Sequence, residues 1–322
     1  MTGASKIPDL VKRAKELNMP AVGITDHGNM HGAYEMWSTA VKEGVKPIIG
    51  IEAYVTPETA RQDQTRVSWD TNWNPDIDPQ HRRRNPNDVS GGGLITHLTM
   101  WAETDEGLVN LMKASTDANL EGRVMRYPRM DKEILAKYSK GIIASSGCPS
   151  GIIQTRLLLG QFDEALRAAG ELQDIFGRDN FYIEFMDHGL KIEKQVTDGL
   201  LDIAKKLNAP LLATNDSHYV RAEDAGSQDA MLCINSGSTL DEPGRFKFDG
   251  TGYYLKSAEE MRELFKDIPE ACDNTLEIAE RCNVMFDDHE DGAFMPQFDC
   301  PEGWDETSLF LEKSRGRLGT AL

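Results

Sequence analysis

The chain has 322 residues, of which 39% are hydrophobic, and carries a formal net charge of −18 at pH 7. This length can bury a sizeable core, and no run approaches the roughly 18 to 20 apolar residues of a membrane span or resembles a signal peptide, so we expect a cytoplasmic protein without a membrane partner. The acidic balance argues against a freestanding nucleic-acid binder, because neutralising phosphates requires clustered Lys and Arg.

From residue 5 to about residue 220, short β-branched strands alternate with amphipathic helices, which predicts an α/β fold with a parallel sheet, either a barrel or a doubly wound sheet. We expect strands at 21–25, 47–55, 94–101, 141–146, 181–185 and 211–214, separated by helices at 6–18, 33–43, 106–119, 151–159, 161–176 and 192–208. The polar stretch 56–93 lacks periodicity and is interpreted as a long loop insertion, and its basic run, 81–84, as solvated loop.

After Tyr219 the sequence changes character, with helices expected at 222–235, 258–265 and 269–281 around an aromatic, glycine-rich segment at 245–257. We therefore predict a domain boundary near residue 225. Residues 1–225 would form the α/β domain, and residues 226–322 a mainly helical connector toward further structure outside this chain.

Residue types that bind metals recur where the expected strands end, which is where parallel β/α folds carry their sites. Six of the expected strands carry such residues at or near their ends. In chain order these are the pair Asp26 and His27, then Glu52, His97 and Cys148, then the pair Asp187 and His188, and last the pair Asp216 and His218. Taken singly, His97 could equally be a satisfied core histidine, and Cys148 an inert buried thiol. Asp216 and His218 are a stronger signal, because alternate residues of an extended segment point the same way. His31, His81 and His289 lie away from these ends and receive no role.

This mixture of side chains suits a hydrolytic metal centre. Imidazole and thiolate favour zinc-like ions, carboxylates can bridge two ions, and closely spaced ions clamp the attacking and leaving oxygens of a phosphoester. The sequence therefore predicts phosphomonoester or phosphodiester hydrolysis.

Six short motifs, in order, resemble those of the PHP domain of bacterial polymerase III alpha subunits, with the actinobacterial version the nearest. They are T-D-H-G-N-M at 25–30, G-I-E-A-Y at 50–54, T-H-L-T at 96–99, G-C-P-S-G at 147–151, M-D-H-G at 186–189 and N-D-S-H-Y at 215–219. The segment 246–261 resembles the stretch by which such proteins pass from the PHP domain to the polymerase domains. The resemblance therefore implies that the connector 226–322 leads toward polymerase palm and thumb domains.

The resemblance implies a distorted seven-stranded β/α barrel with up to three divalent ions, zinc and/or manganese or magnesium. It implies the metal ligands His27, Glu52, His97, Cys148, Asp216 and His218, with no catalytic residue beyond them. Asp26 and His188 would orient ligands or touch substrate.

The sequence departs from the family at its start. The family has a first strand carrying His-x-His and then an Asp, whereas this sequence begins Met1-Thr2-Gly3-Ala4 with Thr2 in the place of that Asp. We expect a barrel lacking its first strand, an incomplete metal cluster and weak activity of this chain alone.

Three functions stay open at this point. The first is the N-terminal PHP portion of a replicative DNA-directed DNA polymerase with a metal-dependent 3′–5′ proofreading exonuclease site. Its partners would be primer-template DNA, a sliding clamp and a proofreading subunit. The second is a non-catalytic structural module that docks replicase partners. The third is a freestanding PHP phosphatase, such as one acting on histidinol phosphate.

Overall fold

The structure is a computed structural model that describes residues 3–70, 93–287 and 298–320. The chain divides into two compact units, Met1–Met285 and Phe286–Leu322. The basic run 81–84, with His81, and also His289 lie outside the described residues. Among the described residues, no helix has the length and apolar character needed to cross a membrane.

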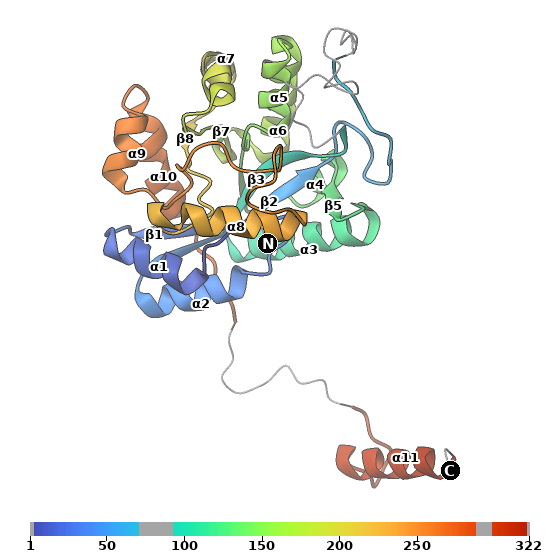
Figure 1. The fold of residues 1–322 in the computed structure, drawn as a ribbon. Helices are drawn as coiled ribbons and strands as arrows, with labels where there is room; N and C mark the ends of the chain where they lie inside the picture. The colour runs from blue at the N-terminus through green and yellow to red at the C-terminus, as the bar shows by residue number, and fades with distance from the viewer. Residues whose placement is uncertain (1–2, 71–92, 288–297, 321–322) are drawn as a thin grey trace. The chain divides into compact units, whose positions relative to one another are not determined.

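The first unit alternates strands and helices as expected (Figure 1). Its strands are β1 (Ala21–His27), β2 (Lys46–Val55), β3 (Thr96–Ala102), β4 (Arg123–Val124), β5 (Tyr127–Met130), β6 (Ile142–Ser145), β7 (Phe181–Phe185) and β8 (Leu211–Ala213). Its helices are α1 (Ile7–Glu16), α2 (Ala33–Glu43), α3 (Asp105–Glu121), α4 (Lys132–Lys137), α5 (Ile152–Leu158), α6 (Phe162–Phe176), α7 (Lys191–Leu207), α8 (Ala225–Ser236), α9 (Ala258–Leu264) and α10 (Pro269–Arg281), with 3₁₀ turns η3 (Arg178–Asn180) and η4 (Ala222–Asp224).

The strands form one mixed eight-stranded sheet in the order β4-β5-β2-β3-β6-β7-β8, with β1 also paired to β2. The mixed α/β fold is confirmed, but the expectation of a purely parallel sheet is wrong. Strand β3 runs antiparallel to both β2 and β6. The described parts of the connection between β2 and β3, residues 56–70 and 93–95, contain no α-helix of the kind that links parallel strands.

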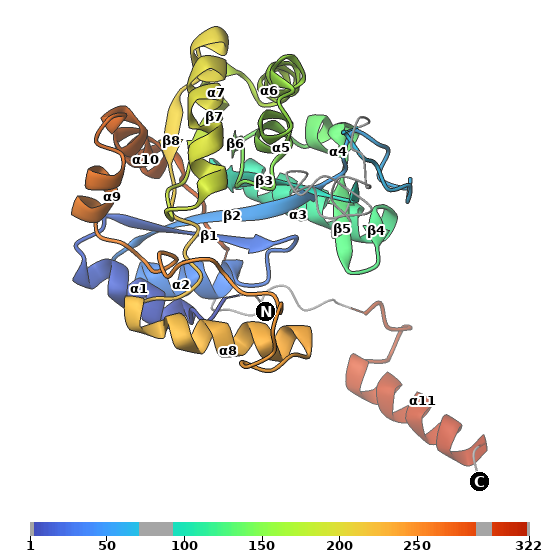
Figure 2. The same cartoon turned by 45° about the horizontal axis from the view of Figure 1, so that its top comes forward.

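Helices cover both sides of this sheet (Figure 2), which explains why β2 is buried along most of its length. Helices α1 and α2 pack near β1 and β2, while α5, α6 and α7 lie beside β6 and β7. The helices follow from periodicity. In α7 the buried Val196, Leu200, Ile203 and Ala204 recur every three or four residues and face the sheet.

The hairpin β4–β5 and the short helix α4 were not anticipated from the sequence. The hairpin turns at Met125, which has a positive φ of 54°. Methionine is not among the Asn and Gly residues that normally announce such a turn, so the sequence carried no signal for it.

The predicted boundary near residue 225 does not separate compact units, because α8, α9 and α10 belong to the same unit as the strands. The interpretation of 226–322 as a connector toward further domains stays a prediction. The second unit contains α11 (Glu306–Thr320), whose first turn is capped by Asp305 Oδ1 accepting from the Ser308 N–H at 2.7 Å.

A single buried arginine joins the start of the insertion to the hairpin. Arg129 on β5 is 0% exposed. Its guanidinium donates to four backbone carbonyls, those of Gly122 (3.2 Å), Leu94 (3.3 Å), Arg61 (2.6 Å) and Asp63 (2.8 Å). Of these four residues, Leu94 and Gly122 are buried.

We expect Arg129→Met to lower the free energy of unfolding by about 3 kcal/mol or more, because a buried side chain loses its hydrogen bonds to four backbone carbonyls at once. Urea denaturation followed by circular dichroism measures the change. Arg123→Met, at an exposed position on the neighbouring strand β4, is the matched control and should change stability by less than about 0.5 kcal/mol. Equal effects of the two substitutions would contradict this role for Arg129.

Candidate metal centre

The centre of the site is the carboxylate of Glu52, which lies between two imidazoles. His27 Nδ1 is 2.6 Å from Glu52 Oε2, and His97 Nδ1 is 2.6 Å from Glu52 Oε1. Strand register produces this arrangement, since His27 on β1 pairs directly with Glu52 on β2. His97 pairs with Tyr54, two residues beyond Glu52, and so faces Glu52 diagonally across the same surface of the sheet.

The antiparallel direction of β3 is what brings His97 to this rim. His97 is the second residue of β3, so it lies near the amino end of its strand, whereas His27 ends β1. Ligand atoms of His27, Glu52 and His97 all lie within 4.8 Å of one another.

The donor geometry fits a cation better than a set of hydrogen bonds. His27 Nδ1 is buried and makes no hydrogen bond of acceptable geometry, although Glu52 Oε2 is 2.6 Å away. Burial opposes ionisation of Glu52, but the neighbouring His97 and His27 outweigh burial and hold its pKa well below the ordinary value. Glu52 is therefore an ionised carboxylate with 6% of its surface exposed.

Cys148 joins this cluster from the segment after β6. Its Sγ lies 3.2 Å from His97 Nδ1 and 3.4 Å from Glu52 Oε1. Burial, with the negative charges of Glu52 and Asp216, raises the pKa of the thiol well above its usual range. A cation at the cluster would reverse this effect, because metals bind the thiolate.

Asp216 and His218 form a second pair on the same rim. His218 Nε2 is 3.2 Å from Asp216 Oδ1, and the His218 ring centroid is 5.9 Å from that of His27. The pair was expected from an extended segment, but β8 ends at Ala213 and Asp216 adopts a positive φ of 42°. A turn and not a strand thus brings the two side chains together, and Asp tolerates that conformation better than most residues.

Asp26 and Gly28 shape the turn that presents His27. Asp26 Oδ2 accepts from the Gly32 N–H at 2.9 Å, and Gly28 N–H donates to the Glu52 carbonyl at 2.8 Å. Gly28 has φ +66°, and a Cβ there would lie 2.5 Å from the Tyr54 ring, so only glycine fits.

His188 is buried beneath the site with both ring nitrogens engaged. Nδ1 lies 2.6 Å from Glu193 Oε1 and Nε2 lies 2.7 Å from the Asn215 carbonyl, and its side chain is 2% exposed. Both partners, a carboxylate and a backbone carbonyl, are hydrogen-bond acceptors. The contact with the Asn215 carbonyl holds the ring against the residue that precedes Asp216, and the role of His188 stays a prediction.

Glu184 is a functional candidate that sequence reasoning missed. It accepts from Ser145 Oγ on β6 and from Thr214 Oγ1 after β8, both at 2.5 Å, and from Gly147 N–H at 3.1 Å. It therefore ties together the rim ends of three strands. The signal was a single carboxylate inside the apolar strand F-Y-I-E-F at 181–185.

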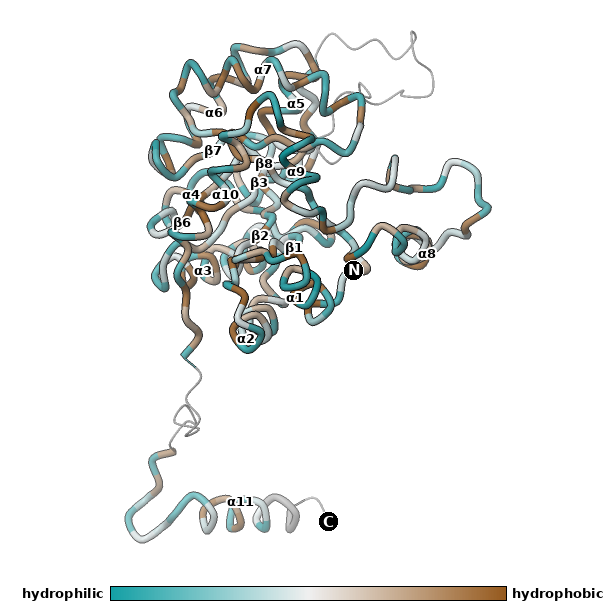
Figure 3. Tube along the Cα trace, turned by 90° about the vertical axis from the view of Figure 1, so that its left-hand side faces the viewer, coloured by the Kyte–Doolittle hydropathy of each residue, from teal (hydrophilic) through white to brown (hydrophobic). Residues whose placement is uncertain are grey.

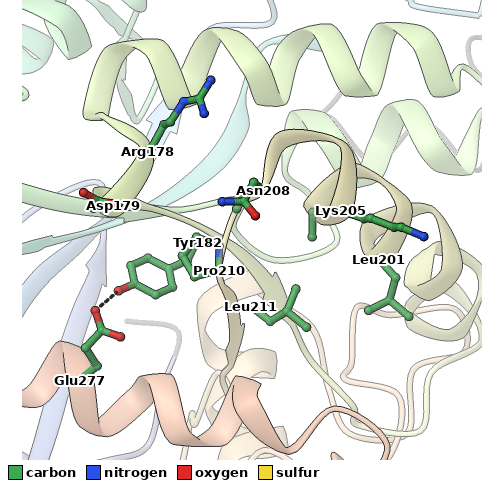
Figure 4. A pocket seen from close by; sticks show the side chains of 11 residues that line it. Arg178, Asp179, Tyr182, Leu201, Lys205, Asn208, Pro210, Leu211 and Glu277 are labelled. Carbon is green, nitrogen blue, oxygen red and sulfur yellow. Dashed lines mark hydrogen bonds between the residues drawn. The ribbon is translucent and has the colours of Figure 1, made fainter.

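A cavity of about 630 Å³ lies elsewhere, at the opposite ends of β7 and β8 (Figure 4). It is lined by Arg178, Tyr182, Lys205, Leu211 and Glu277 among others, and none of the expected metal ligands borders it. The Tyr182 hydroxyl and Glu277 Oε1, 3.2 Å apart, form a hydrogen bond at its edge.

The fold and this rim define a β/α protein with a clustered His, Glu and Cys site of the kind that holds divalent metal. The PHP domain family matches residues 1–188, and the chain belongs to that family.

Curated relatives named "DNA polymerase III subunit alpha" are similar over nearly the whole chain. The relative from Mycobacterium tuberculosis is 50% identical over 309 residues, covering 96% of this chain and 25% of its own length. Those from Saccharopolyspora erythraea and Borreliella burgdorferi are 54% and 36% identical, covering 87% and 97% of this chain and 23% and 25% of their own lengths. The higher identities agree with the actinobacterial resemblance. The chain spans about a quarter of the length of these relatives.

A solved structure from Bifidobacterium adolescentis, described as a metal-dependent phosphoesterase, aligns with a TM-score of 0.39 at 16% identity, covering 82% of this chain and 92% of that one. That likeness is too distant to bear on the chemistry of this chain.

The environment of Glu184 makes a pH-dependent prediction. Burial, opposed by hydrogen bonds from Ser145 and Thr214 and reinforced by the charges of Glu52 and Asp216, raises the pKa of Glu184 from 4.5 to about 7. The folded protein thus keeps a proton that the unfolded chain releases. Its contribution to stability is complete below about pH 4.5 and is lost as pH rises through about 7.

Glu184→Gln has no such proton to lose. The unsubstituted protein should lose stability as pH rises from about 5 to about 8, and the variant should not lose this part. We therefore expect the free energy of unfolding of the variant minus that of the unsubstituted protein to rise by about 2 to 3 kcal/mol over this range. Urea denaturation in EDTA at several pH values measures the difference. A difference between the two proteins that does not vary with pH would contradict the raised pKa.

Proposed function

We propose that this chain is the PHP portion of a replicative DNA-directed DNA polymerase and that its rim site hydrolyses phosphodiester bonds at the 3′ end of DNA. The support is twofold. Similarity to polymerase alpha subunits continues well past residue 188, where the PHP family match ends. The six side chains singled out by motif meet at the rim, four in one cluster and two in an adjacent pair.

The convergence of His27, Glu52 and His97 around one point carries this proposal. With Cys148, Asp216 and His218 they would hold divalent ions, zinc and/or manganese or magnesium. Bound ions supply a hydroxide near neutral pH and offset negative charge on the phosphoester oxygens. Imidazole and thiolate donors favour zinc over magnesium at the inner cluster.

The chain's own residues would prepare this site in three ways. Glu52 is already ionised, so it would bind a cation without first losing a proton. The Cys148 thiol must lose its proton when a metal binds, so metal affinity should fall as pH falls. Glu184 and His188 hold the rim segments in register without reaching the reacting atoms.

The wider assembly is also part of the proposal. Primer-template DNA would be presented by polymerase domains outside this chain, in the cytoplasm, with a sliding clamp and a proofreading subunit as further partners. A freestanding phosphatase that acts on histidinol phosphate is the weaker alternative. The similarity to polymerase subunits extends beyond residue 188, where the match to the PHP family ends. A structural, partner-docking module is the outcome if no chemistry is found.

We expect His97→Ala to weaken metal binding at least about 10-fold, since even residues that merely orient ligands cost about 10- to 100-fold. Metal content after dialysis and 3′-exonuclease activity on a mismatched primer are measured together, and both should fall. His31→Ala, an exposed histidine in the turn before α2, is the control and should retain both.

If the unsubstituted chain binds no zinc or manganese, or if its trimming of the primer survives in His97→Ala, the hydrolytic role is wrong. The docking-module function then stands in its place.

A further inference from the structure

The connection between α8 and α9, residues 237–257, carries aromatic rings that the proposed hydrolysis does not use. It is tied to the segment holding Asp216 and His218, because the Tyr253 carbonyl accepts from the backbone N–H groups of His218 at 2.8 Å and Tyr219 at 3.2 Å. Figure 3 shows α8 and this connection at the edge of the first unit, apart from the central strands.

Side chains fix the same attachment. Lys256 Nζ donates to Asn215 Oδ1 at 2.5 Å, and Asn215 Nδ2 donates to the Tyr254 carbonyl at 2.5 Å. Asn215 immediately precedes Asp216, so the connection and the ligand-bearing turn are held as one piece.

From this attachment a row of rings leads outward from the metal centre. The Phe248 ring meets His218 edge to face, with centroids 4.7 Å apart and an interplanar angle of 75°. Phe246 in turn lies 6.0 Å from Phe248 at 90°. Phe246 is 62% exposed, so most of its ring faces solvent.

An exposed phenylalanine contributes little to the core. Phe246 is linked to His218 of the candidate site through Phe248, and a ligand with a flat apolar face would fit against its open ring. Nucleobases have such a face, and stacking on aromatic side chains is tolerant of sequence. Stacking also needs no positive charge. In a chain with a net charge of −18, affinity for DNA cannot come mainly from phosphate contacts. Lys247, which lies between Phe246 and Phe248 in the sequence, is exposed and would add one cation for the phosphate backbone of a bound DNA strand.

We propose that Phe246 and Phe248 form a stacking platform for the terminal nucleobase of single-stranded DNA whose phosphodiester lies at the metal centre. This inference rests on the proposed function and adds the element that recognises its substrate. The platform selects a strand end with a base over a bare phosphoester, and it does so without reading base identity.

The test compares two short oligothymidylate strands with hydrolysis-resistant phosphorothioate linkages, one with an ordinary 3′ nucleotide and one with an abasic 3′ end. Fluorescence anisotropy with the manganese-loaded chain should show about 10-fold tighter binding of the strand with the base. Phe246→Ala should abolish most of this preference, and Phe246→Trp should retain it. Leu240→Ala, in the same connection and 54% exposed, should behave as the unsubstituted chain.

Equal binding of the two strands, no binding of either, or a preference that survives in Phe246→Ala would overturn the platform. Hydrolysis of glycerol phosphate and of an unmodified strand is measured in parallel. Hydrolysis without a base preference leaves the proposed function standing and removes the platform. A base preference without hydrolysis supports the platform and removes the proposed function.

Discussion

The burial of one ionised carboxylate, Glu52, between two imidazoles is the constraint on which the site depends. A charge with 6% of its surface exposed is costly unless partners surround it, and here the partners are His27 and His97, one from each neighbouring strand. Both contacts require the register of β1, β2 and β3. A slip of one residue in either pairing would turn the imidazole to the other face of the sheet, so the site and the central sheet specify each other.

A second level of organisation lies beneath the ligands. Glu184 joins the ends of β6, β7 and β8, while the His188–Glu193 pair and Lys256 hold the Asn215 peptide and side chain. These are buried polar contacts, which are costly when incomplete and rigid when complete. They allow Asp216 to keep a backbone conformation that its sequence neighbours would not impose on it, and so place it beside His218.

The connection after α8 changes how the C-terminal part of the first unit is understood. Its sequence suggested a route away from the domain, yet its backbone pairs with the Asp216–His218 turn and its rings extend from His218 into solvent. A segment that leaves a domain can thus also complete the rim of that domain's site.

The sequence by itself determined the helices of the first unit other than α4, six of the eight strands and the rim on which metal-binding residue types collect, because hydrophobic periodicity and strand ends are local properties. It did not determine the direction of β3, the hairpin at Met125, the role of Glu184 or the burial of both nitrogens of His188. Those depend on which strand lies next to which, and on pairs such as Ser145 and Glu184 that are far apart in the chain. Tertiary structure decided them because strand direction and buried hydrogen bonds are settled only when distant segments pack together.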